Sequence, residues 1–420
     1  MKPIFVGREQ EQREFRQWLI SEPTEAGGRR AALLIGPAGM GKSALLLRFE
    51  DLCINHKPER WYVQRVSLNA NETPSAFLER LLLDTHRLFA GKLLRKGPHD
   101  RHLLKELLKA IPTLGNILAA LVDEDKRPGW QRFLDYAAVL SEMLAGSRDC
   151  FVLLVDPDMA MQSGQADEWL TIAADLPERV HVVIAQRPDD VIAAHTEARR
   201  RFGLIPTTGS LPDLDEDSVR QWYEAEIIKG GRLIEAAKHW GTDAVRRLPA
   251  AAYKRYRGHP VAHDAIVRLL AVDEVDDPVA AVAQWPRAVA ELMDMLFASL
   301  TRQGEERLRA ALVLQVFSVP TPREAWAQAA SLSVEALTAA LADARYGHFF
   351  TPGHGGVYMP FHDLFAQRLE RELESMPQRT QELAEAAWQA IEPVLDRECL
   401  ATSIPGEFEL MAATRVASRF

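Results

Sequence analysis

A glycine-rich stretch, GPAGMGKS at residues 36–43, carries groups that bind phosphate at a characteristic spacing. Gly36, Gly41, Lys42 and Ser43 fit the pattern GxxxxGK[ST]. Glycines let the backbone curl so that its N–H groups point toward phosphate oxygens. Lys42 can neutralise the β- and γ-phosphates of a nucleotide, and the Ser43 hydroxyl can bind Mg²⁺. The loop residues expected to contact the nucleotide are Gly36, Pro37, Ala38, Gly39, Met40, Gly41, Lys42, Ser43 and Ala44.

The segments on either side supply the strand and the helix that such a loop requires. AALLI at residues 31–35 is a short apolar run typical of a buried strand, and SALLLRFEDL at residues 43–52 is typical of a helix. A helix that begins at the loop adds partial positive charge where phosphate binds. A glycine-rich turn can match the pattern by chance, but strand, full motif and helix together favour a site for ATP or ADP.

Such a site also needs an acidic side chain on a neighbouring strand to hold Mg²⁺, and FVLLVDPD at residues 151–158 offers one. FVLLV is a continuous apolar run, as expected of a parallel strand buried on both faces. Asp156 follows it, at the end of the strand where open α/β sheets bind ligands. Asp156 is therefore the expected Mg²⁺ ligand beside Ser43, and the alternative is an acidic turn after a strand.

The residue after this acid departs from what hydrolysis favours. Many sites of this kind carry a second acid directly after the first, to orient the attacking water, whereas here Pro157 follows Asp156. Pro157 fixes its own φ and constrains its neighbour. Asp158, the next acid, therefore either substitutes as the catalytic carboxylate or points away from the site.

A third strand is predicted within RVHVVIAQRPDD, residues 179–190. It ends close to Arg187, whose guanidinium could reach a γ-phosphate and act in catalysis. The alternative is a loop arginine that caps the acidic pair Asp189 and Asp190.

The remaining pattern predicts an α/β fold with further helical domains behind it. A strand at 61–69, a helical insert near 75–145 and a short strand near 207–211 complete a P-loop NTPase core with a mostly parallel sheet over residues 1–212. Three further segments follow: a helical lid domain at 213–285, a winged-helix domain at 286–375 with a hairpin at TPGHGG, and C-terminal helices at 376–420.

Composition narrows the class of protein. The 420 residues are 47% hydrophobic and 26% charged, with a net charge of −9, which argues mildly against a general nucleic-acid or membrane-surface binder. Three cysteines lie far apart, which suits a reducing compartment. The sequence shows no signal peptide and no apolar run long enough to span a bilayer, so a cytoplasmic protein is expected.

Taken in order, these motifs resemble those of the STAND NTPases, the signal-transduction ATPases with numerous domains that include the NB-ARC and NACHT branches. FVGRE at 5–9 resembles the motif that opens their nucleotide module, GPAGMGKS resembles their Walker A and LLVDPD their Walker B. VVIAQRP resembles the sensor strand, GHP at 258–260 their GxP motif, and FHD at 361–363 the MHD motif of their winged helix. The resemblance covers roughly residues 3–375.

The resemblance implies a role for each matching residue. Val6, Gly7 and Arg8 would lie beside the adenine, Arg187 would sense the γ-phosphate, Pro260 would pack on the nucleotide, and His362 would read the β-phosphate of ADP. Phe361 stands where MHD has methionine, Gln186 where the sensor strand has threonine, and Pro157 interrupts the acidic pair. On their own, GHP would be only a helix-start turn and His362-Asp363 only a first-turn pair.

We therefore expect an ATP/ADP-dependent switch in signal transduction or defence, with slow ATP hydrolysis and with nucleotide held between the P-loop core and the winged helix. An unknown protein or ligand would trigger it, and activation would produce a homo-oligomer. The rival interpretation is a DNA-acting AAA+-like ATPase, such as an initiator or transposition helper. Its recognition helix would be LSVEALTAALADAR at 332–345, which carries Glu335, Asp343 and a single Arg345, so DNA binding is not expected. A metabolic P-loop kinase would not need the lid and winged helix.

Relatives of this class carry an effector at one end and a sensor at the other. The P-loop module starts at residue 3, which leaves no room for an N-terminal effector, and residues 376–420 are too few for a repeat array. The chain is expected to be part of a longer protein, with 376–420 the start of its sensor region, or to have its sensor on a partner.

Overall fold

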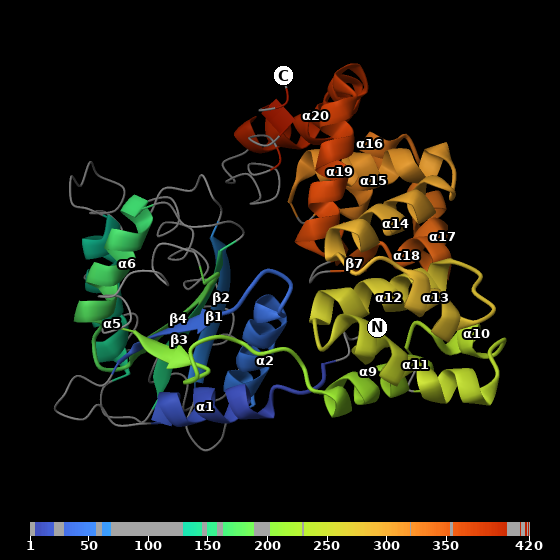
Figure 1. Cartoon of the computed structure of the whole chain (residues 1–420). Coiled ribbons are helices and arrows are strands. Elements are labelled where there is room, and N and C mark those ends of the chain that lie inside the picture. The colour runs from blue at the N-terminus through green and yellow to red at the C-terminus, as the bar shows by residue number, and fades with distance from the viewer. Residues whose placement is uncertain are drawn as a thin grey trace, which may run out of the picture. The chain divides into compact units, whose positions relative to one another are not determined.

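The computed structural model describes most of the chain outside the predicted helical insert. The described residues are 5–20, 29–55, 61–68, 129–144, 149–157, 163–188, 202–228, 231–319, 321–352, 356–400, 412, 416, 417 and 419. The chain divides into two compact units (Figure 1). The first unit is Gly7–Asp213, and the second is Leu214–Phe420 together with Met1–Val6. The four segments proposed from sequence, and the boundaries between them, stay predictions.

The first unit is built on a five-stranded sheet in the order β2-β3-β4-β1-β5. All four strand pairs are parallel, which confirms the predicted α/β class. The short edge strand lies earlier than expected, at 203–205 rather than near 207–211. Leu211 lies beyond this strand, and its N–H donates to the carbonyl of Ile35. The strands are β1 (Ala31–Ile35), β2 (Trp61–Leu68), β3 (Cys150–Pro157), β4 (Val180–Gln186) and β5 (Gly203–Ile205).

Helices cover both faces of this sheet (Figure 1). Alternate strand residues, including Leu33, Leu153 and Val182, form one core with α5 and α6. On the opposite face, Phe15 of α1 stacks on Phe49 of α2 with ring centroids 3.9 Å apart. Strands β1 and β3 are nearly continuous apolar runs because both of their faces are buried. The helices are α1 (Glu9–Ile20), α2 (Lys42–Ile54), α5 (Gly129–Met143) and α6 (Ser163–Asp175). Most of the predicted insert, residues 75–128, lies outside the described residues.

Among the described residues of both units, none of the helices combines the length and the apolar character that crossing a membrane requires.

The second unit is mainly helical, and a single hydrophobic core extends from Leu214 to Val416. The helices of this unit are α9 (Glu216–Ile228), α10 (Ile234–Ala237), α11 (Thr242–Tyr256), α12 (Pro260–Val272), α13 (Pro278–Gln284), α14 (Val289–Thr301), α15 (Glu305–Phe317), α16 (Arg323–Ala330), α17 (Val334–Ala342), α18 (Ala344–Gly347), α19 (Asp363–Ser375) and α20 (Pro377–Leu400).

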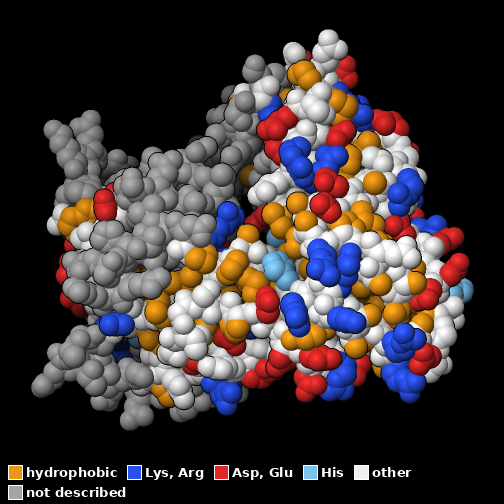
Figure 2. All heavy atoms as spheres, viewed as in Figure 1, with side chains coloured by type: hydrophobic (Ala, Val, Ile, Leu, Met, Phe, Trp, Pro, Cys, Tyr) orange, Lys and Arg blue, Asp and Glu red, His pale blue; other side chains and the backbone are white. Residues whose placement is uncertain are grey.

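A small antiparallel sheet, in the order β6-β8-β7, lies within this unit. Its strands are β6 (Thr321–Pro322), β7 (Phe350–Pro352) and β8 (Val357–Pro360), and the pairing of β7 with β8 confirms the predicted hairpin. Residues 353–355 of its turn lie outside the described residues. The element order α15, β6, α16, α17, β7, β8 is the order expected of a winged helix, and that assignment stays a prediction. Figure 2 shows acidic and basic side chains interspersed over the face of this unit that is in view.

Two buried histidines, His181 and His263, and the half-buried His348 affect the stability of the two units. In the second unit, Nδ1 of His263 accepts from the Tyr223 hydroxyl at 3.3 Å, and Nε2 donates to the Arg257 carbonyl at 2.6 Å, an arrangement that the neutral ring satisfies. His181 of β4 and His348, the C-cap of α18, each keep one ring nitrogen buried without a hydrogen-bond partner. Burial lowers the pKa of all three imidazoles to about 4.

These histidines predict a loss of stability in mild acid. Above pH 6.5 the ring is neutral in both the folded and the unfolded chain. As the pH falls toward 4, the unfolded chain binds protons that the folded chain cannot, which destabilises the fold by about 2 kcal/mol per histidine at pH 5. Urea unfolding at pH 7 and pH 5 measures this difference. His263→Gln should reduce it, the exposed control His239→Gln should not, and an identical pH dependence in both variants would contradict the prediction.

Candidate nucleotide-binding site

The P-loop joins β1 to α2 through a backbone turn that requires glycine. Gly39 and Gly41 have φ angles of 79° and 81°, in the left-handed region that side chains disfavour. Gly41 is also the N-cap of α2, and no side chain caps that end of the helix. The first N–H groups of a helix have no partner within it, so this end suits an anion.

The Lys42 side chain folds back over the start of the loop. Its Nζ donates to the carbonyl of Gly36 at 2.7 Å and to the carbonyl of Pro37 at 2.9 Å. The half-buried ammonium therefore lies over the turn that the glycines form. Ser43 and Ala44 are exposed at the first turn of α2, where a hydroxyl can take part in binding Mg²⁺.

The first residue of the loop is held by both neighbouring segments. The N–H of Gly36 donates to the Gln186 carbonyl at the end of β4, at 3.1 Å. On its other side, a Cβ atom at residue 36 would lie 3.1 Å from Cβ of Leu211, tighter than ordinary packing. A side chain at residue 36 would have to displace Leu211, so this close approach favours glycine there.

Arg8 binds the P-loop backbone from within the FVGRE motif. Its Nη1 donates to Oε1 of Glu11 at 3.0 Å, its Nη2 donates to the Met40 carbonyl at 3.2 Å, and both charged side chains are 6% exposed. Gly7 and Arg8 have φ angles of 68° and 66°, so the chain turns sharply before α1. Sequence reasoning missed Glu11, although its place in the first turn of α1, three residues after Arg8, is a usable signal. Contact of Gly7 and Arg8 with adenine stays a prediction, as does that of Val6, which falls in the second unit.

Asp156 and Arg187 lie at the same edge of the sheet as the P-loop. Because the strands are parallel, β1, β3 and β4 all end there. Val155 and Ile184 face the α5 and α6 side, so alternation turns Asp156 and Arg187 toward the face that carries α1 and α2. One expectation is corrected: the strand of Asp156 is not next to β1, because β4 lies between β1 and β3. The P-loop strand β1 instead lies between β5 and β4, and β4 leads to Arg187.

These residues fit a Mg²⁺-bound nucleotide. Mg²⁺ binds through one or two carboxylates together with phosphate oxygens and water, so Ser43 and the half-buried Asp156 suffice on the protein side. In the described parts of the chain, no group of three or more His, Cys, Asp or Glu side chains is placed to hold a metal ion. Asp158 lies outside the described residues, and its catalytic role stays a prediction.

Gln186 is a second residue that sequence reasoning left without a role. Its side chain is 1% exposed, and neither amide atom has a hydrogen-bond partner. Alternation along β4 turns this side chain toward α5 and α6, away from the face of Arg187. Its backbone carbonyl nevertheless fixes Gly36, so Gln186 supports the P-loop through the main chain.

The GHP motif begins α12 of the second unit. Pro260 occupies the first helical position, which its fixed φ favours, and His259 is the N-cap. Gly258 is required by close approach, since a Cβ there would lie 1.7 Å from the Leu214 carbonyl oxygen. GHP therefore forms a turn at the start of a helix, as the second interpretation of this motif from the sequence stated. Contact of Pro260 with the nucleotide stays a prediction.

His362 begins α19 as its N-cap. Its Nδ1 accepts from the N–H of Leu364 at 3.1 Å, so the neutral ring carries its proton on Nε2. The pKa of this imidazole lies below its usual value, chiefly because the ring is shielded from water, while Asp363 and Asp264 oppose the shift. His362 therefore presents one N–H donor that its helix does not use.

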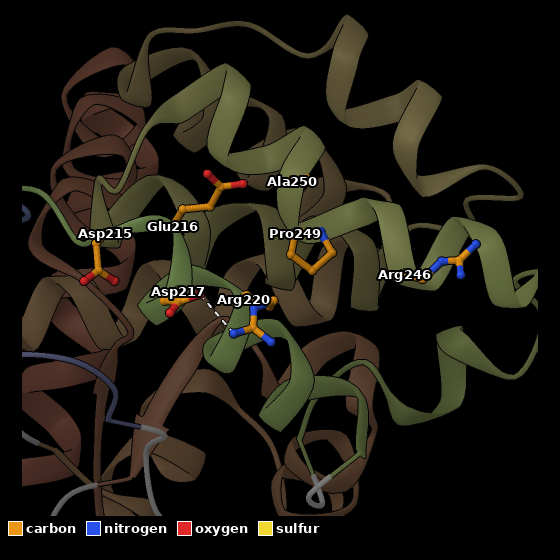
Figure 3. A pocket seen from close by; sticks show the side chains of 7 residues that line it. All are labelled: Asp215, Glu216, Asp217, Arg220, Arg246, Pro249 and Ala250. Atoms are coloured by element: carbon orange, nitrogen blue, oxygen red, sulfur yellow. Dashed lines mark hydrogen bonds and ion pairs between the residues drawn. The ribbon is translucent and has the colours of Figure 1, made fainter.

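An open pocket of about 410 Å³ lies between the start of α9 and α11 (Figure 3). Asp217 pairs with Arg220 on its wall at 2.9 Å. None of the predicted site residues contributes to it. Its lining consists of Asp215, Glu216, Asp217, Arg220, Arg246, Pro249 and Ala250.

Comparison with known proteins agrees with this geometry. Residues 4–202 match the AAA ATPase domain family. A STAND protein with a tetratricopeptide repeat sensor from Pyrococcus horikoshii matches 99% of this chain at 14% identity, with a TM-score of 0.55. The chain spans about half of that protein's length, 48%. No curated protein sequence matches the chain.

Two solved structures match with lower scores. The Walker-type ATPase of Pyrococcus abyssi is 12% identical, with coverage of 87% of this chain and 96% of that one and a TM-score of 0.41. The Aeropyrum pernix Orc1 protein in complex with DNA is 15% identical, with coverage of 89% and 94% and a TM-score of 0.37.

Residues 4–202 thus contain a domain similar to the AAA ATPase domain family. The fold of the chain is similar to that of the STAND protein, which agrees with the resemblance seen in the motifs.

The buried Arg8–Glu11 pair yields a test of what Arg8 does. Arg8→Met leaves Glu11 buried without its cation and should destabilise the first unit by about 3–5 kcal/mol, whereas Arg8→Met with Glu11→Leu should recover most of that loss. Urea unfolding measures the stability, and Arg13→Met on the exposed face of α1 is the control. ATP affinity of the stable double variant then tests the predicted contact with adenine. Weaker binding would support that contact, and unchanged affinity would show that Arg8 acts only through Glu11 and the P-loop backbone.

Proposed function

We propose that this protein is an ATP/ADP-dependent molecular switch in signal transduction or defence, with slow ATP hydrolysis and an ADP-bound resting state. The observation that supports it most is that the likeness to a STAND protein covers 99% of the chain and so extends past the ATPase domain that ends at residue 202. The second unit would then be part of the nucleotide-dependent machinery.

In the first unit, the Lys42 ammonium would move from the carbonyls of Gly36 and Pro37 to the phosphates of the nucleotide, because a charged acceptor makes a stronger hydrogen bond. Mg²⁺ held by Ser43 and Asp156 would neutralise phosphate charge. Arg187 would contact the γ-phosphate from the end of β4, and its loss of that contact on hydrolysis would distinguish ADP from ATP.

The second unit would report which nucleotide is bound. Nε2 of His362 would donate to the β-phosphate of ADP, and Pro260 would pack on the nucleotide at the start of α12. Because this contact would favour one nucleotide state, it would shift the population of the closed form. Exchange for ATP would release the second unit, here assigned as a lid and a winged helix, for assembly with other copies in response to a protein or ligand trigger in the cytoplasm.

A DNA-acting ATPase is not favoured by the surface chemistry. Helix α17, the counterpart of a recognition helix, carries Glu335 and no lysine or arginine. Readout of base edges and phosphates needs arginine, lysine, asparagine or glutamine at that place.

Nucleotide content and turnover test the ATPase part of the proposal. Purified wild-type protein should release ADP on denaturation and hydrolyse Mg-ATP slowly. Lys42→Ala should abolish binding, and Asp156→Asn should reduce turnover at least about a hundredfold while nucleotide binding without Mg²⁺ persists. Asp149→Asn, on the opposite end of β3, is the control. Turnover that survives both site variants would contradict the proposal, and Asp158→Ala would show whether that carboxylate is the catalytic acid.

Release of ADP tests the switch part of the proposal. His362→Ala should speed dissociation of a fluorescent ADP analogue by about tenfold, the effect of losing one hydrogen bond to a charged group. His362→Asn keeps the N-cap of α19 and separates that role from phosphate contact. Equal release rates in wild type and both variants would contradict a phosphate-reading histidine.

A further inference from the structure

A buried arginine of α12 contacts the residue that precedes His362. The Arg268 side chain is 10% exposed, and its Cζ lies 3.9 Å from the centroid of the Phe361 ring. Its Nη1 donates to the carbonyl of His348, the C-cap of α18. Its Nε donates to Oδ2 of Asp264 at 2.8 Å, one turn earlier on α12. One guanidinium thus joins three elements: α12, the end of α18 and the FHD motif.

A chain of alternating charges holds this arginine in place. Asp264 accepts from Arg232 at 2.7 Å as well as from Arg268, and Arg232 in turn donates to Glu226 at the end of α9. Glu226 is 1% exposed and also accepts from Trp222 and from the N–H of Arg232. Burial lowers the pKa of Arg268 to about 10, so its guanidinium stays charged at neutral pH. Every charge in the chain therefore has a partner.

Both the backbone and the ring of Phe361 contact neighbouring residues. The backbone N–H of Phe361 donates to the Phe349 carbonyl at 3.1 Å, and the centroid of the Phe361 ring lies 5.2 Å from that of Phe365 on α19. A planar guanidinium stacks on an aromatic face in a way that neither lysine nor an aliphatic side chain reproduces. The backbone at Phe361 leads directly into His362, whose imidazole caps α19. The direction of the imidazole therefore depends on how Phe361 is held.

We propose that Arg268 is a positioning residue for His362: by stacking on Phe361 and holding the end of α18, it sets the direction of the imidazole that reads the phosphate of ADP. The inference rests on the proposed function. It gives a reason for phenylalanine at residue 361, where the resembling motif carries methionine. It also gives the Glu226–Arg232–Asp264 chain a role, since that chain fixes the orientation of the arginine.

Dissociation of the fluorescent analogue mant-ADP from the full chain tests this role. Phe361→Met, which keeps apolar bulk and removes the ring, should speed release by about tenfold, while Phe361→Tyr, which keeps the ring, should leave it within about twofold. Arg268→Lys should speed release to a similar extent. Arg268→Lys combined with Phe361→Met should release no faster than either single variant, because both changes remove one interaction.

A second arginine in the same unit supplies a matched control. Arg368 also stacks on a phenylalanine: its Cζ lies 3.8 Å from the centroid of the Phe297 ring, and its Nε pairs with Oδ1 of Asp294 at 2.8 Å. It lies beyond the first turn of α19. Arg368→Lys should lower the thermal unfolding temperature about as much as Arg268→Lys does and leave release of mant-ADP unchanged. This comparison separates positioning from general loss of stability.

The outcomes distinguish the two proposals. If His362→Ala speeds release but Arg268→Lys and Phe361→Met do not, the positioning role fails and the proposed switch stands. Equal acceleration by Arg368→Lys would also overturn the positioning role, because any destabilised variant would then release the analogue. Unchanged release in His362→Ala would overturn the proposed switch and the positioning role with it.

Discussion

The candidate site depends on one hydrogen bond, from the Gly36 N–H to the Gln186 carbonyl, which joins the P-loop to the end of β4. It ties the first residue of the P-loop to the end of β4, directly before Arg187. Because β4 lies between β1 and β3, the strand that leads to Arg187 separates the loop from the strand of Asp156. A shift of the loop by bound phosphate would therefore act first on the end of β4. This order of strands places the end of β4, rather than the end of β3, beside the start of the phosphate loop.

A buried ion pair also fixes the backbone of this loop. The Arg8 guanidinium donates to Glu11 and to the Met40 carbonyl, so the pair joins the start of α1 to the P-loop backbone. The second unit uses a longer version of this device, in which Glu226, Arg232, Asp264 and Arg268 alternate in sign. Removing one member of such a chain leaves an uncompensated buried charge. In both units, paired charges therefore fix backbone that the proposed function needs in one place.

Both units place helix N-termini at the residues proposed to meet phosphate. Helix α2 has no side-chain cap because Gly41 occupies that position, whereas α19 is capped by His362 itself. A histidine that accepts with Nδ1 must donate with Nε2 if it is neutral, and the lowered pKa favours that form. The role of His362 as a cap thus leaves Nε2 as the donor for the proposed phosphate contact.

The sequence by itself determined the P-loop, its flanking strand and helix, the strands that lead to Asp156 and Arg187, the hairpin and the start of α19. These features depend on local rules: glycine at positive φ, apolar runs for buried strands, and the spacing of apolar residues along a helix. The tertiary structure alone decided the position of β4 between β1 and β3, the edge strand at Gly203–Ile205, and the partners of Arg8 and Arg268. These depend on which segments meet in space, because parallel strands pair across long connections and buried charges find partners far along the chain.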